Sequence, residues 1–65
     1  MIKTVIKAQS GMVLTFDAEG EQMSEYQGCY QDVRGSILKD APADAVFTHW
    51  INHADEPKMI ARRDW

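Results

Sequence analysis

The chain has 65 residues, of which 45% are hydrophobic and 26% charged, and a net charge of −3 at pH 7. This balance is that of a globular domain and disfavours disorder, while the length suffices for one domain with a thin core. A single cysteine excludes an intrachain disulfide, and no apolar run approaches the length of a membrane span. We therefore expect one small domain over residues 1–65, soluble and, because a lone thiol without an export signal suits a reducing compartment, cytoplasmic.

The first two elements form a predicted β-hairpin. Residues 2–8 alternate with a period of two and are rich in β-branched side chains, which predicts a strand. Residues 9–11 end in a glycine and provide the turn, and residues 12–17 return as the second strand. One side of this hairpin carries the larger apolar residues and is expected to face the helix: Ile2, Ile6, Leu14 and Phe16.

A helix is predicted over residues 24–40. Ser24 is suited to the N-cap and Gln27 to the third helical position, which together make a capping box. Pro42 disfavours helical geometry at the residue before it, so the helix should end by Asp40. Its buried stripe follows a helical spacing through Tyr26, Tyr30, Val33 and Ile37.

Gly28 and Gly35 would lie seven residues apart on the opposite side of this helix. Each glycine costs about 1 kcal/mol relative to alanine inside a helix. The pair indicates either a smooth strip for a partner's backbone, neutral drift, or a helix that is broken near Gly28.

The C-terminal third is ambiguous. Residues 45–53 fit a helix over 43–54, but they are rich in Val, Phe, Thr, Trp and Ile, so we predict a strand. Residues 53–57 would form a loop and residues 58–63 the last strand. The predicted fold is therefore α+β, ββαββ, with a four-stranded sheet and one helix packed on one face. An antiparallel helical hairpin in place of the second β-hairpin is the alternative. In element order alone, the chain resembles the β-grasp arrangement of small immunoglobulin-binding domains.

No catalytic, cofactor or metal site is predicted. Cys29 flanks the apolar stripe of the helix and is expected to pack as a small hydrophobe. His49 and His53 would lie about 13 Å apart on a strand, too far to share one ion. The acidic residues Asp17, Glu19, Glu21 and Glu25 fit a solvated loop, and no nucleophile-elbow, phosphate-loop or zinc-protease motif occurs.

The second side of the sheet provides the candidate binding surface. If the first and last strands are neighbours and Met59 and Ala61 face the helix, basic side chains would surround two apolar ones and an aromatic. The predicted binding residues are Lys3, Val5, Lys7, Trp50, Lys58, Ile60 and Arg62. Such a face suits a non-catalytic interaction module, either a homodimer or an accessory subunit of a protein complex. The alternative is binding of nucleic acid or another polyanion, and no membrane association is expected.

Overall fold

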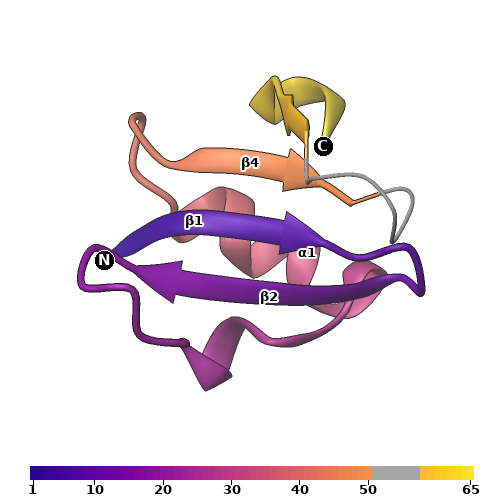
Figure 1. Ribbon diagram of the computed structural model, residues 1–65, viewed down its shortest axis with the longest axis horizontal. Helices are drawn as coiled ribbons and strands as arrows, with labels where there is room; N and C mark the ends of the chain where they lie inside the picture. Colours follow the sequence, from indigo (N-terminus) through magenta and orange to yellow (C-terminus); the bar gives the residue numbers. More distant parts are fainter. Residues whose placement is uncertain (51–57) are drawn as a thin grey trace.

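In the described part of the chain, five strands form one mixed sheet, and a single α-helix packs behind it in the view of Figure 1. The computed structural model describes residues 1–50 and 58–65. Its elements, in chain order, are β1 Ile2–Lys7, β2 Met12–Asp17, the 3₁₀ turn η1 Ser24–Tyr26, β3 Gly28–Cys29, α1 Tyr30–Asp40, β4 Val46–His49, β5 Lys58–Ile60 and the 3₁₀ turn η2 Arg62–Asp64. The prediction of an α+β domain with one helix is confirmed.

The strands lie in the order β3-β2-β1-β4-β5. The pairs β1–β2, β2–β3 and β4–β5 are antiparallel, and β1–β4 is parallel. The predicted sheet of four strands thus gains the two-residue β3. The expectation that the first and last strands are neighbours is wrong, because β4 lies between β1 and β5.

A bulge in β1 decides which side of the sheet meets the helix. The β1–β2 register shifts between Ile2 and Thr4, so Ile2 and Val5 are both buried although they lie three positions apart. The helix-facing side then continues with Val13 and Thr15, both fully buried. Our expectation that Ile6, Leu14 and Phe16 face the helix is therefore wrong, because the bulge inverts the alternation after Ile2.

The helix begins five residues later than predicted, because Gly28 adopts φ +147°, a conformation that favours glycine. Ser24 starts only the 3₁₀ turn η1, and Cys29 is the extended N-cap residue of α1. The glycine strip therefore does not exist, since Gly28 precedes the helix. The end at Asp40 is as predicted, with an extended Ala41 before Pro42.

The strand prediction for the C-terminal third is confirmed for Val46–His49, where the helical alternative is wrong. The predictions for Ile51, His53 and the loop 53–57 lie outside the described residues. The last strand ends at Ile60, earlier than expected, and the chain then turns through η2.

The core lies between the sheet and α1. It consists of Ile2, Val5, Val13, Ile37, Ala41, Phe47 and Trp65. Trp65 is only 3% exposed, and its ring meets the rings of Tyr30 and Phe47 edge to face, each at 5.1 Å between centroids. The helix has 11 residues, and no helix within residues 1–50 and 58–65 is long and apolar enough to cross a membrane.

Candidate functional site

The side of the sheet opposite α1 is predominantly apolar and is not covered by any described helix or strand (Figure 1). Residues directly opposite each other in a sheet share a side, so the strand pairing identifies its members. We call this side the helix-free face, and it comprises Thr4, Ile6, Met12, Leu14, Phe16, Cys29, Val46, Thr48 and Met59. The thiol of Cys29 is the one ionisable group among these side chains, and none of them is a carboxylate, a cation or a histidine.

The apolar residues of the helix-free face do not contribute to the core. Met12 and Met59 are 41% and 74% exposed. Ile6, Leu14 and Phe16 are half-buried, and none of them packs against the core cluster. Large apolar side chains gathered on one solvent-facing surface are typical of interaction sites.

Two apolar residues of the predicted binding surface lie on the helix side instead. Val5 is fully buried in the core, so it is not available to a partner. Ile60 pairs with Phe47 and packs partly against the same core. The prediction that Met59 faces the helix is likewise wrong. Trp50 is half-buried and its main-chain N–H donates to the Lys7 carbonyl at 2.8 Å.

The predicted cations have separate local interactions. Lys3 forms an ion pair with Asp44 at 3.5 Å. The ammonium of Lys7 lies 4.0 Å from the centroid of the Tyr30 ring, an arrangement that attracts a cation to the ring face. Lys58 is exposed on the edge strand β5. These residues therefore do not form one continuous basic surface.

Arg62 closes the C-terminal end of α1. One terminal nitrogen of its guanidinium donates to the carbonyl of Ala41 at 2.9 Å and to that of Pro42 at 2.5 Å. Carbonyls at a helix C-terminus lack intrahelical donors and carry a partial negative charge, so a cation suits this position.

The structure also shows where the lone cysteine and the acidic cluster lie. Cys29 is exposed, so the expectation that it packs in the core is wrong. Asp17 Oδ1 accepts hydrogen bonds from the main-chain N–H groups of Glu19 and Glu21 at 3.0 and 2.9 Å, a turn that explains part of the acidic cluster. Within the described part of the chain, no group of three His, Cys, Asp or Glu side chains is arranged to hold a metal.

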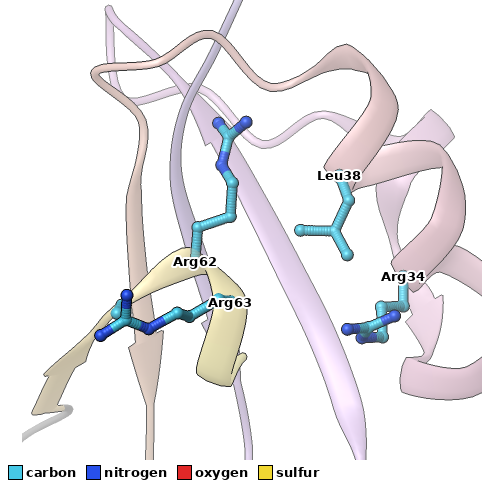
Figure 2. Close-up of a pocket in the computed structure, with 5 residues that line it drawn as sticks. Arg34, Leu38, Arg62 and Arg63 are labelled. Atoms are coloured by element: carbon cyan, nitrogen blue, oxygen red, sulfur yellow. The ribbon is translucent and has the colours of Figure 1, made fainter.

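A second candidate site is an arginine-lined cavity between α1 and the segment around η2 (Figure 2). It has a volume of about 490 Å³ and is lined by Arg34, Leu38, Ala61, Arg62 and Arg63. Arg34 and Leu38 lie four residues apart on one side of α1. The site therefore combines guanidinium groups with an apolar wall.

Tyr26 is the one described residue with a resolved shift of its pKa. Its hydroxyl donates to Asp40 Oδ2 at 2.6 Å. This hydrogen bond, with partial desolvation and the negative charge of the Asp40 carboxylate, raises the pKa of Tyr26 above 10.0. The contact ties η1 to the last turn of α1.

Compared with known protein families, curated proteins and solved structures, the chain shows no significant match. Evidence for a function therefore comes from the geometry of the chain itself. Two features carry it, the helix-free face and the arginine-lined cavity.

Sequence reasoning missed both features for identifiable reasons. The helix-free face was assigned to the core because its residues are as apolar as those of the covered side. The cavity had one signal in the sequence, which is that the chain has only three arginines, Arg34, Arg62 and Arg63. Nothing in their spacing showed that α1 and η2 would bring them together.

Proposed function

We propose that the protein is a small, non-catalytic interaction module that self-associates by packing its helix-free face against that of a second copy. The observation that carries the proposal is the set of apolar side chains on this face that do not join the core. The competing surface from the sequence, centred on Val5 and Ile60, has less support because Val5 is fully buried.

The size of the face suits a dimer. The molecule measures 29 Å by 24 Å along its two longer axes, and Figure 1 views it down the third, with the helix-free face toward the reader. That outline sets an upper limit for the face on the order of 700 Å², somewhat below the roughly 800 Å² that each partner buries in a standard interface. The face is therefore of the order of size that a small dimer interface needs.

The chemistry of the face also favours a second copy. It has no carboxylate or cationic side chain, so an apolar partner suits it, and an identical face meets that requirement. Two sheets pack face to face at about 10 Å by interdigitating such side chains, and two-fold symmetric dimers are the commonest oligomers. A chain of 65 residues also has a thin core, which a shared apolar layer would supplement.

Binding of nucleic acid through the sheet is less well supported. That alternative needs cations and an aromatic on one exposed side. Lys3 and Lys7 are engaged with Asp44 and the Tyr30 ring, and Arg62 is bound to carbonyls at the end of α1. Oligonucleotide titrations at low and at moderate salt would nevertheless expose such binding through a steep salt dependence.

Sedimentation velocity across about 1 to 100 µM protein tests the proposal. We expect a dimer at the upper concentrations, and monomers for Leu14→Lys and Met59→Lys, which bring a charge into the interface. Met59 is largely exposed, so its substitution leaves the fold intact. Ser36→Lys adds the same charge on the exposed side of α1 and should still dimerise. A wild-type protein that remains monomeric at every concentration would refute self-association.

A further inference from the structure

We infer that the arginine-lined cavity binds a small organic anion, a carboxylate or phosphate ester that carries an apolar group. This site is separate from the helix-free face, because it lies between α1 and η2 on the other side of the sheet. Its volume of about 490 Å³ falls within the range of small-molecule pockets, about 300 to 1,000 Å³. The inference does not depend on the proposed dimer.

The concentration of charge is the first argument. All three arginines of the chain line the cavity, although Arg34 lies far from Arg62 and Arg63 in the sequence. The protein as a whole is acidic. Among the described residues, however, none of the three arginines forms an ion pair, whereas Lys3 pairs with Asp44. The lining of the cavity contains no carboxylate, so a bound anion would supply the counter-charge that these guanidinium groups lack there.

The free donors are the second argument. A guanidinium has five N–H donors in a planar fork that matches a carboxylate or phosphate. Arg34 uses Nε for the Tyr30 hydroxyl at 2.8 Å, and Arg62 uses one terminal nitrogen for two carbonyls. Arg63 is exposed and makes no hydrogen bond to any described residue. Donors for an anion therefore remain on each of the three side chains.

Two of the arginines are already held in place, which lowers the entropic cost of binding. Arg34 is fixed by Tyr30, whose hydroxyl in turn donates to the main-chain oxygen of Trp65. Arg62 is fixed at the end of α1, toward which its side chain extends in Figure 2. Arg63 extends away from Leu38 in the same view, so it must rotate to close on a ligand.

The apolar wall specifies the rest of the ligand. Leu38 projects from α1 toward the segment Ala61–Arg63 in Figure 2, and Ala61 lines the same space. Neither residue can pair with a charged group. A ligand that fits both halves of the cavity has an oxyanion at one end and an aliphatic or aromatic group at the other, whereas inorganic phosphate would use only the arginines.

Nitrogen-15 NMR titrations with phenyl phosphate, benzoate, inorganic phosphate and benzyl alcohol test this inference. We expect saturable shifts at Arg34, Leu38 and Ala61–Arg63 with the first two probes, weaker binding of inorganic phosphate, and no comparable shifts with benzyl alcohol. Tighter binding of phenyl phosphate than of benzoate would identify phosphate esters as the ligand class, and the reverse order would identify carboxylates. Equal shifts with benzyl alcohol would overturn the inference.

Matched variants separate specific binding from general charge attraction. Arg63→Gln removes a guanidinium without a structural contact and should weaken phenyl phosphate binding about tenfold, the usual effect of losing a charge-assisted hydrogen bond. Lys39→Gln removes the same charge from the exposed side of α1 and should leave the affinity unchanged. Equal weakening by both variants would overturn the inference. Met59→Lys should leave binding intact even where it abolishes self-association, so the two proposals fail independently.

Discussion

The indole of Trp65 donates its Nε1–H to the carbonyl oxygen of Thr48 across 3.1 Å. This hydrogen bond fastens the segment after η2 to the interior strand β4. The Trp65 ring also packs on Phe47, which lies beside Thr48 in β4, and on Tyr30 at the start of α1. One side chain therefore joins the sheet, the helix and η2, which positions the arginine-lined cavity as well.

Replacing Trp65 with alanine should cost about 3 to 5 kcal/mol of unfolding free energy, because it removes a buried aromatic ring and leaves a cavity. Trp65→Phe should cost less, since it keeps a ring but leaves the Thr48 carbonyl without its donor. Urea denaturation followed by circular dichroism measures both. Asp64→Ala, on an exposed neighbour, should change stability by no more than about 0.5 kcal/mol. A Trp65→Ala protein as stable as wild type would show that this packing is not essential.

Local sequence patterns were sufficient to predict much of the fold. Alternation predicted β1 and β2, β-branched and aromatic residues predicted β4, and Pro42 predicted the end of the helix. Each of these elements depends on chemistry within a few residues. The capping box at Ser24 was misleading because Gly28 needs φ +147°, which interrupts any helix that starts before it, and sequence alone does not reveal a glycine's φ.

Long-range relationships could not be predicted. The two sides of the β1–β2 hairpin are similarly apolar, and a bulge between Ile2 and Thr4 determines which one is buried. The burial of Trp65 depends on η2 turning the chain back over β4. The candidate sites depend on these same relationships. The sequence placed Val5 and Ile60 on one side of the sheet, but it did not show that α1 covers this side.

Adjacent substitutions in β1 test which side of the sheet is the core. Val5→Thr should cost about 1 to 3 kcal/mol, because it buries a hydroxyl in place of a methyl group. Ile6→Thr should cost about 1 kcal/mol or less at concentrations where the protein is monomeric, since the side chain lies on the helix-free face. Both replacements remain β-branched, so strand propensity is retained. Urea denaturation that finds Ile6→Thr more costly than Val5→Thr would contradict the assignment.

Two glycines should respond to alanine in opposite directions. Gly28→Ala should lose about 1 to 3 kcal/mol, because an L-residue is strained at φ +147°. The added Cβ would lie 3.5 Å from Val33 Cγ1, an ordinary contact, so the loss comes from backbone strain rather than a clash. Gly35 is helical with no atom near an added Cβ, so Gly35→Ala should gain about 0.5 to 1 kcal/mol. Thermal denaturation measures both, and a stabilised Gly28→Ala would indicate that the helix extends back through this residue.

The hydrogen bond from Tyr26 to Asp40 predicts a stability contribution that is lost at high pH. Because the folded state raises the pKa of Tyr26 above 10.0, the unfolded chain ionises first as the pH rises. The contribution is therefore fully present below pH 10.0 and disappears as the pH rises through the folded pKa. The difference between the near-ultraviolet tyrosinate titrations of wild type and Tyr26→Phe isolates this group and should have its midpoint above 10.0. Asp40→Asn should lower that midpoint, because it removes the carboxylate charge. A wild-type midpoint at or below 10.0 would exclude the hydrogen bond as a persistent contact in solution.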